Sequence, residues 1–429
     1  MTNFKLLFVA FFATLISMSY TSHAQVYPLG ESVELFYFTP TESSSVDVVD
    51  FIAYTPEQHF LESKAPRFVL TDSKHRFALG IGGVVRGVTS VDFAGIIPTS
   101  TDEGFQNAYI PTTLGNLPKA QAQMSAATSE VFVKLVGSAG RLGNFTVYTS
   151  MNFMGENYTP QLRKAYVQFC GFTAGQLWST MTDLNALPPT IDYAGPISYA
   201  GYHVPQVRYG RLFARERMQF AIAAEDPTVY ATYSTTAVAQ AQGVPNFVAY
   251  LQANGDGGGH IRVSGIYRNM NYKDLNIDLS DNTSGWGVQL SGVSNLGSVL
   301  KLYYQGIYGE GIASYMNDLS NLPYDMVANQ NIMGNMQVMP MWGCYGGIQI
   351  NLSESVYMST TYSYSRLYGI DSYDMHDVYK HAQYYVANMF WDITNDCTFG
   401  VEYIHGNRRD HFGAWGVANR ANIMVQYSF

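Results

Sequence analysis

Charged side chains are scarce in this chain of 429 residues. Asp, Glu, Lys and Arg together make up 13% of it, whereas soluble proteins carry roughly 25%. After the amino terminus the sequence also lacks any stretch of about twenty unbroken apolar residues, the length that a membrane-spanning helix needs. These two absences argue against an ordinary soluble protein and exclude helical membrane spans. Membrane-spanning strands that alternate apolar and polar residues are compatible with both observations, because the apolar, membrane-facing residues do not form a continuous run and do not raise the average hydropathy.

Cysteine is rare as well, and the spacings typical of enzymes and metal sites are missing. Cys170, Cys344 and Cys397 are an odd number with no CxxC spacing, so no disulfide framework is expected, although one optional bridge stays open. The nine histidines show no HxxxH or HExxH spacing, and no GxSxG motif stands between a strand and a helix. We therefore predict no enzyme activity, no resident metal and no cofactor.

Three further features bear on possible ligands: a group of aspartates, a cluster of glycines and the net charge. Asp371, Asp374 and Asp377 leave a divalent-cation site open, although calcium needs a larger set of oxygen ligands. Gly80-Ile81-Gly82-Gly83 has no helix after it, so we predict a bend or a close-packing site rather than a phosphate cradle. A formal net charge of −9 argues against a nucleic-acid partner.

The amino terminus has the pattern of a secretory signal. Lys5 precedes an apolar run that ends at Ile16, and Ser22-His23-Ala24 provides a small-x-small cleavage site, so residues 1–24 are predicted to be a signal peptide. Residues 25–75 carry four prolines and no sustained helical pattern, and we expect a periplasmic or plug-like segment there. Export leaves the periplasm, the cell surface or the outer membrane as destinations.

Alternating runs separated by turn residues fill residues 76–429. In the last run, Ala421, Ile423, Val425, Tyr427 and Phe429 fall on one side of a period-two pattern, and mostly polar residues fall on the other. An even number of such strands fits a closed membrane barrel. We predict sixteen, at residues 77–89, 128–137, 143–154, 162–169, 172–178, 206–213, 217–225, 247–253, 260–269, 284–293, 298–308, 343–351, 355–365, 378–390, 397–406 and 417–429.

Short and long connections alternate between these strands. Cys170-Gly171 is a short one, while residues 90–127, 179–205, 226–246 and 309–342 are long. All twelve prolines after residue 76 fall in, or at the ends of, long connections. A proline inside a closed barrel would remove a ladder hydrogen bond, and short periplasmic turns opposite long outer loops are typical of membrane barrels. We predict an all-β, transmembrane, antiparallel up-and-down barrel over residues 76–429.

The alternation also assigns faces to the side chains. In 143–154, the odd-numbered residues from Phe145 to Phe153 are predicted to face lipid. In 260–269, Ile261, Val263, Gly265 and Tyr267 are predicted to do so. The charged residues predicted to face inward are mostly basic: Lys134, Lys164, Arg208, Arg217, Arg262 and Arg268, with Glu225 as an acid. Fixed positive charge in a narrow aqueous channel favours anions. The alternative is that these charges pair with loop carboxylates and are indifferent to solute.

The connection 179–205 is too long for a simple turn. Pro188-Pro189 and Gly195-Pro196 would give it a fixed path, and we expect it to fold into the lumen. Asp183 and Asp192, set opposite wall arginines, would then form one side of a transverse field at a constriction. An ordinary surface loop is the alternative.

Several segments resemble the DcaP-type trimeric outer-membrane porins. They are RKAYVQFCGFTAGQLWSTMTD (163–183), DYAGP (192–196), PNFVAYLQ (245–252), GHIRVSGIYR (259–268), VANMFW (386–391), GVEYIHGNRR (400–409) and ANRANIMVQYSF (418–429). The resemblance implies a sixteen-stranded homotrimeric barrel that takes up small anions, often dicarboxylates, by passive diffusion. Related sequences tend to carry arginines where this chain has Tyr250 and Gln252, so its predicted pore lining is less basic. The amino-terminal segment lacks the coiled-coil pattern of some members.

A porin in the outer membrane of a Gram-negative bacterium is therefore the leading hypothesis. Its expected partners are membrane lipid, lipopolysaccharide, small anionic solutes and the outer-membrane assembly machinery, with Tyr427 and Phe429 as the carboxyl-terminal assembly signal. A surface-binding adhesin or receptor, acting through 91–127 and 309–342, is a second class. A barrel-embedded hydrolase is the third.

Overall fold

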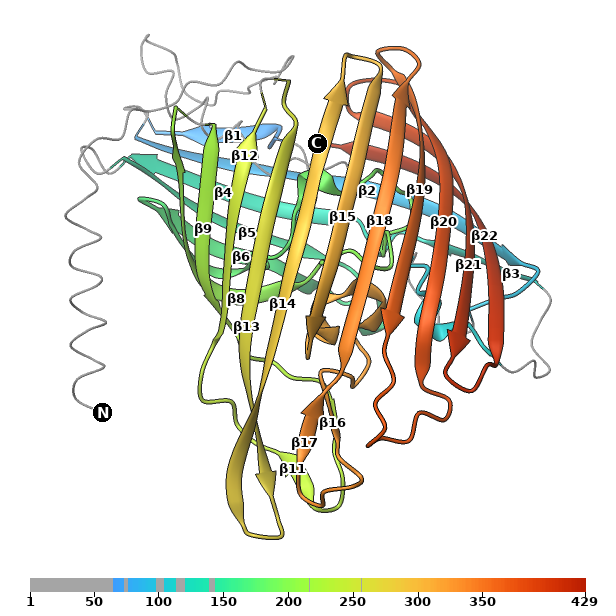
Figure 1. Ribbon diagram of the computed structural model, residues 1–429. Helices are drawn as coiled ribbons and strands as arrows, with labels where there is room; N and C mark the ends of the chain where they lie inside the picture. The colour runs from blue at the N-terminus through green and yellow to red at the C-terminus, as the bar shows by residue number, and fades with distance from the viewer. Residues whose placement is uncertain are drawn as a thin grey trace.

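Sixteen strands form one closed antiparallel barrel in the computed structural model (Figure 1). It describes residues 65–72, 76–97, 104–112, 120–138, 143–215, 217–255 and 257–429; the predicted signal peptide lies outside them. The barrel strands are β2 (Phe77–Phe93), β4 (Glu130–Ser138), β5 (Asn144–Asn152), β6 (Gln161–Phe169), β7 (Phe172–Trp178), β8 (His203–Phe213), β9 (Met218–Glu225), β12 (Asn246–Asn254), β13 (His260–Asp274), β14 (Leu279–Leu296), β15 (Leu300–Glu310), β18 (Pro340–Asn351), β19 (Val356–Leu367), β20 (Tyr379–Asp392), β21 (Cys397–Asp410) and β22 (Trp415–Ser428).

The barrel closes because β22 pairs with β2 from Val84↔Ser428 to Phe93↔Asn419. Each of the sixteen predicted strands corresponds to one of these elements, so the predicted fold class is confirmed. Among the described residues, no helix has the length and apolar composition to cross a membrane.

The two faces alternate as the sequence predicts. In β5, Val147 and Met151 are exposed on the outer face while Thr146, Tyr148 and Ser150 point inward and are buried. In β22, Ile423, Val425 and Tyr427 are exposed while the residues between them are buried. A charge on the outer face near the bilayer midplane costs about 2–4 kcal/mol, which enforces this pattern.

Strand β2 is shared between the two ends of the chain. Its first half pairs with β4 and with β1 (Phe68–Thr71), and its second half pairs with β22 and with β3 (Ala120–Ser125). Gly83 and Phe429 exchange backbone hydrogen bonds of 2.8 and 2.9 Å. A Cβ on Gly83 would lie 2.5 Å from the Glu130 carbonyl oxygen and 2.9 Å from the Phe429 ring. These glycines therefore form a close-packing site, as predicted.

Turns at one end of the barrel are short, and two of them use left-handed backbone. Cys170-Gly171 and Ala214-Arg215 all have positive φ, between 50° and 82°, which matches the twist that a two-residue hairpin turn needs. The proline prediction was wrong at two positions: Pro340 is the first residue of β18 and pairs with Glu310, and Pro205 lies inside β8 and pairs with Gln176. Pro205 is the third residue of β8, which begins before the predicted strand start at 206.

The opposite end carries larger elements. The β13–β14 hairpin continues past the predicted limits 269 and 284 and extends well beyond the barrel at the lower end of Figure 1. Beside it lie β10 (Ala231–Thr232), β11 (Ala237–Ala239), β16 (Met326–Ala328) and β17 (Met336–Val338). Buried side chains of β11, β16 and β17 form a small separate core with Met270 and Tyr272 of β13.

Apolar residues of the long connections also fill part of the barrel. Short 3-10 helices bring them in: η1 (Asn107–Tyr109), η5 (Ala313–Tyr315) and η6 (Asn317–Leu319). Their side chains pack on inward residues of β12 to β22 in one cluster that includes Phe105, Met316 and Tyr384. The remaining short helices are η3 (Glu156–Tyr158) and η4 (Leu184–Ala186).

Candidate functional site

The β7–β8 connection, residues 179–202, runs along the inner wall of the barrel. It begins at Glu225 of β9, whose carboxylate accepts hydrogen bonds from the Thr180 N–H (2.6 Å) and the Ser179 hydroxyl (2.9 Å). Tyr315 of η5 donates to the same carboxylate at 3.1 Å. The inward charge of Glu225 thus fixes the start of the connection.

Asp183 anchors the next part of the connection to β13 and β14. Its carboxylate lies 2.8 Å from His260 Nε2, accepts a hydrogen bond of 2.6 Å from Ser291 and lies 3.8 Å from Arg262. Burial alone would raise the pKa of Asp183, but Arg262, His260 and Ser291 lower it to about 2. Asp183 has no exposed surface, so it holds the segment in place and does not face an open passage.

Asp192 anchors the far end of the connection to β20 and β21. It accepts hydrogen bonds from the Phe105 N–H at 2.7 Å and from the Tyr384 hydroxyl at 2.8 Å. Glu402 accepts the N–H groups of Ile191 and Asp192 at 2.7 and 2.8 Å. Burial, and then the Glu402 carboxylate, raise the pKa of Asp192 to about 7. The predicted transverse field therefore requires correction, because Asp192 too is fully buried.

Tyr193 reaches the opposite wall of the barrel. Its hydroxyl accepts hydrogen bonds from Arg163 of β6 and from Asn152 of β5. Arg163 also lies 3.4 Å from Glu130 and stacks over the rings of Trp178 and Tyr193. Between Asp192 and Tyr193 the connection therefore spans from β21 to β6, which narrows the lumen.

A register shift puts two cations on the inner face of β6. The β5–β6 ladder is irregular between Ser150 and Met151, so Arg163 and Lys164 are both buried inside, although strict alternation would separate them. Lys164 lies 4.0 Å from Glu130 and 5.3 Å from the Tyr148 ring centre. Lys134 of β4 is inward and 6% exposed.

The other predicted wall residues divide into held and partly exposed groups. Arg268 is fully buried, 2.8 Å from Asp325, and donates to the Gly311 carbonyl and the Ser314 hydroxyl. Arg262 is partly exposed, donates to Gln252 at 2.7 Å and lies over the Tyr250 ring.

Arg208 points inward from β8 and is partly exposed. Arg217 lies in the exposed turn before β9. Tyr427 is exposed on the outer face, and the Phe429 ring packs at Gly83.

Most charged side chains of the inner wall are buried, Lys134, Lys164 and Arg268 among them, and those that are partly exposed are mostly basic. The wall acids Asp92, Glu130, Glu225, Glu402 and Asp410 are at most 5% exposed. Arg208, Arg262 and Lys301 are partly exposed. Asp392, at the short-turn rim, is a partly exposed acid. Buried acids contribute little to the surface that a solute meets, so the accessible part of the wall is more basic than the sequence total.

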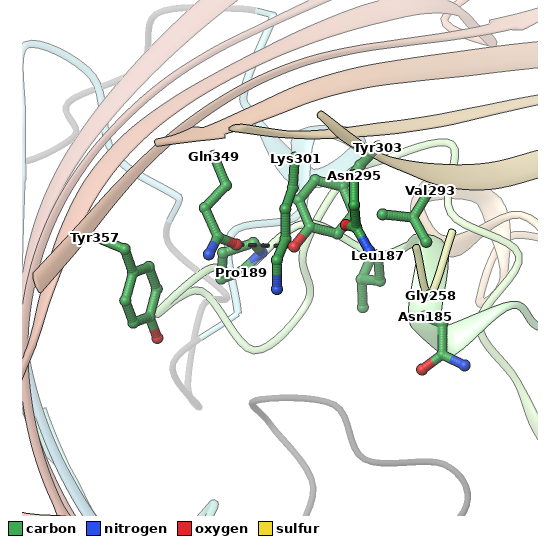
Figure 2. Close-up of a pocket in the computed structure, with 10 residues that line it drawn as sticks. All are labelled: Asn185, Leu187, Pro189, Gly258, Val293, Asn295, Lys301, Tyr303, Gln349 and Tyr357. Atoms are coloured by element: carbon green, nitrogen blue, oxygen red, sulfur yellow. Dashed lines mark hydrogen bonds between the residues drawn. The ribbon is translucent and has the colours of Figure 1, made fainter. Parts of the chain in front are cut away.

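The sequence reasoning missed Lys301, Tyr193 and Glu402. Lys301 lines a cavity of about 430 Å³ between the β7–β8 connection and the wall, together with Asn185, Leu187, Pro189, Gly258, Val293, Asn295, Tyr303, Gln349 and Tyr357 (Figure 2). Its alternation with Tyr303 and Gln305 in β15 would have placed it inward. Alternation with Val401 and Tyr403 in β21 would likewise have placed Glu402 inward. Tyr193 carries no comparable signal, because its role depends on the path of the connection.

Metal and disulfide alternatives find no support among the described residues. No group of three or more His, Cys, Asp or Glu side chains there is arranged to hold a metal ion, so Asp371, Asp374 and Asp377 do not form the cation site left open above. The three cysteines are free.

Comparisons with known proteins agree with this geometry. The family profile described as the porin subfamily matches residues 106–425. The outer membrane channel DcaP of Acinetobacter baumannii has a similar structure, with a TM-score of 0.71 and 20% identity over 84% of this chain and 99% of that one. An anion-selective porin from Comamonas acidovorans gives a TM-score of 0.54 and 11% identity over 82% and 100%.

OmpT of Vibrio cholerae gives a TM-score of 0.53 and 10% identity over 84% of this chain and 100% of that one. No curated protein sequence matches. The predicted likeness to DcaP is confirmed at the level of the fold. The family profile covers about three quarters of the chain. The chain therefore belongs to the porin subfamily, as a β-barrel of the Gram-negative outer membrane.

Proposed function

We propose that the barrel conducts small hydrophilic solutes by passive diffusion and prefers anions, dicarboxylates among them. The observation that supports the preference is the exposure difference on the inner wall, where the acids are buried and Arg208, Arg262 and Lys301 are partly exposed. Positive charge at a water-filled constriction raises the local concentration of anions. The buried ion pairs limit the effect, so the preference is mild.

Recording from purified protein in a planar lipid bilayer tests this function. We expect stepwise conductance in potassium chloride and a reversal potential, under a salt gradient, whose sign shows that chloride passes more readily than potassium. Absence of steps would rule out the channel. A cation-selective reversal potential would leave the channel and overturn the preference.

We also propose that the protein is a homotrimer, and polar groups on the outer face of the barrel support this. His405 Nδ1 lies 2.8 Å from Asn419 Oδ1, and the Tyr403 hydroxyl donates to the same oxygen at 3.0 Å. Hydrocarbon disfavours such groups, whereas a neighbouring copy covers them at lower cost. Native mass spectrometry should give three times the chain mass. A single-chain mass in mild detergent would contradict the trimer.

Surface binding remains a second candidate because of the β13–β14 hairpin. Its tip exposes Leu275, Ile277 and Leu279, each at least 45% accessible, and exposed apolar groups that gather on one surface favour contacts with partners. The second predicted binding loop, 309–342, instead packs largely inside, through Met316 and Leu319. Deleting 274–280 should abolish surface binding and leave conductance intact if this candidate is correct.

A further inference from the structure

We propose that the cavity beside Lys301 is a binding site for a hydroxylated monocarboxylate such as a sugar acid. The proposal rests on the proposed diffusion function, because the cavity opens from the same lumen. It assigns a solute class to one position in the channel, on the short-turn side of the β7–β8 connection.

The cavity has the size and the boundaries of a small-molecule site. Asn185, Leu187 and Pro189 of the connection form one side, and β14, β15, β18 and β19 supply the other (Figure 2). Its volume of about 430 Å³ lies within the usual range for ligand sites, about 300–1,000 Å³. The connection is anchored nearby, since the Tyr345 hydroxyl donates to the Ala186 carbonyl at 3.0 Å and Ser359 donates to Pro189 at 3.1 Å. The site is therefore largely formed before a solute arrives.

Lys301 gives the site its charge. Of the described residues that line the cavity, Lys301 is the only charged one. Its ammonium group makes no hydrogen bond or ion pair with any described residue, and it points into the space between Tyr357 and Asn185 in Figure 2. The cations Arg163, Arg262 and Arg268 are held by acids. Lys301 is thus available to a carboxylate in a way that these three are not.

The remaining polar groups suit hydroxyls better than a second carboxylate. Tyr303 donates to Gln349 Oε1 at 2.8 Å, and Gln349 Nε2 donates to Asn351 at 2.7 Å, which fixes the amide in the wall. The Asn185 amide is exposed and makes no hydrogen bond with any described residue. Amides both donate and accept, as a hydroxyl does. A second carboxylate would find no second cation among the described lining residues.

The Tyr357 ring adds an apolar surface to the site. It stacks on Phe390 with ring centres 5.0 Å apart, so its orientation is fixed. A flat ring beside amides and one ammonium combines the contacts that a hydroxylated carbon chain with one carboxylate makes: apolar contact for C–H groups, hydrogen bonds for hydroxyls and an ion pair for the acid.

Gluconate binding tests the proposal. Purified full-length protein is titrated with sodium gluconate by calorimetry in detergent, and block of the potassium chloride current by gluconate is measured in a bilayer. Succinate and glucose are the comparison solutes. We expect gluconate to bind more tightly than either, because succinate lacks the hydroxyls and glucose lacks the charge.

Matched variants separate the site from general charge effects. Lys301→Met should weaken gluconate binding at least about tenfold, the loss typical of one charge-assisted hydrogen bond, and Lys301→Arg should retain it. Asn185→Ala should weaken gluconate binding while leaving succinate binding unchanged. Lys273→Met is the control, because Lys273 pairs with Asp278 in the distant hairpin and its loss should change nothing.

Three results would overturn the site: no gluconate binding by the native protein, equal binding by Lys301→Met, or tighter binding of succinate than of gluconate. Each leaves the channel itself standing as long as stepwise conductance is seen. Loss of stepwise conductance would instead overturn the proposed function, and the calorimetric titration would still report on the site.

Discussion

The two walls of the barrel differ in what their inward polar groups bind. On the wall from β13 to β21, called the covered wall here, inward side chains hold the connections: Glu402 and His260 bind residues 183–192, and Arg268 binds residues 311–325. On the opposite wall, from β4 to β9, Glu225 and Arg163 also contact the connection, but the inward groups of β4 to β6 bind one another as well. Phe132, Tyr148 and Tyr166 stack, with ring centres 5.5 and 5.3 Å apart, and Lys164 lies over Tyr148.

This difference shows how one barrel can be both rigid and permeable. The covered wall uses buried charge to fix the connections that narrow the lumen. The opposite wall holds the start of the connection at Glu225 and contacts it again at Tyr193, while Lys164 pairs with Glu130 within the sheet. Changes to the covered wall should therefore reduce stability, and changes to accessible wall cations should alter ion preference with little effect on stability.

Breaking the Arg268–Asp325 pair should have the largest effect. Arg268→Met leaves the Asp325 carboxylate buried without its cation, which costs about 3–5 kcal/mol. The free energy of unfolding is measured by guanidinium titration with tryptophan fluorescence in detergent. Asp278→Asn, which removes a pair in the exposed hairpin, is the control and should be neutral. An equally small change in both variants would contradict the comparison.

Releasing the end of the β7–β8 connection comes next. Glu402→Leu leaves the N–H groups of Ile191 and Asp192 and the amide of Asn422 without their acceptor. We expect a loss of about 2–4 kcal/mol, since each unsatisfied buried donor costs about 1–3 kcal/mol and partial relaxation recovers some of it. Single-channel records should also show more frequent closures. Glu402→Gln keeps an acceptor and should behave closer to the native protein.

The pH dependence of stability tests the same anchor. Because the pKa of Asp192 is raised from 3.8 to about 7 by burial and Glu402, the folded protein holds more protons than the unfolded chain between these values. Stability should therefore fall as pH rises through this range, by about 1 kcal/mol per pH unit, and level off above 7. Asp318, with its pKa raised to about 6 mainly by burial, acts in the same direction.

Asp192→Asn should reduce the change in the free energy of unfolding per pH unit. This slope is compared between the variant and the native protein, so a difference in their absolute stability does not affect the test. Unfolding titrations at pH 5, 6, 7 and 8 give the comparison. A native slope of the opposite sign, or an unchanged slope in the variant, would contradict the assignment.

The smallest effect is expected from the accessible cation of β8. Arg208→Met should lower the ratio of chloride to potassium permeability by roughly twofold, because one partly exposed charge contributes a modest part of the field in a wide, screened channel. Its stability should change by less than about 0.5 kcal/mol. Arg211→Met, on the outward face of the same strand, should leave the permeability ratio unchanged.

The strands could be predicted from sequence because membrane and water act on alternate residues. Val147 and Tyr148 differ in exposure for that reason alone, and the same holds along β13 and β22. The extension of the β13–β14 hairpin was missed because its buried side chains, Met270 and Tyr272, pack on residues of β11, β16 and β17, which lie outside the hairpin and which a local pattern does not reveal. Arg163 was missed because a register shift between β5 and β6 turns its side chain inward. The sequence contains no pattern that predicts this shift.

The site was less predictable than the fold. Arg262 and Arg268 lie on the inward face of β13, as predicted, because the alternation of residues along a strand determines the face on which each side chain lies. The burial of Asp183 and Asp192 depends on which wall the connection touches, and this is decided by distant residues such as His260 and Glu402. His260 is 77 residues from Asp183, and Glu402 is 210 residues from Asp192. Local sequence patterns cannot predict contacts over such separations.

The seating of Phe429 on Gly83 has a consequence for biosynthesis. Strand β2 emerges among the first parts of the barrel, yet the edge of residues 84–93 that pairs with β22 gains its neighbour only when the final strand arrives, more than 300 residues later. Contacts of such long sequence separation form slowly. The nascent protein therefore carries an unsatisfied sheet edge until synthesis ends, and a chaperone that shields residues 84–93 would protect it from aggregation during transit.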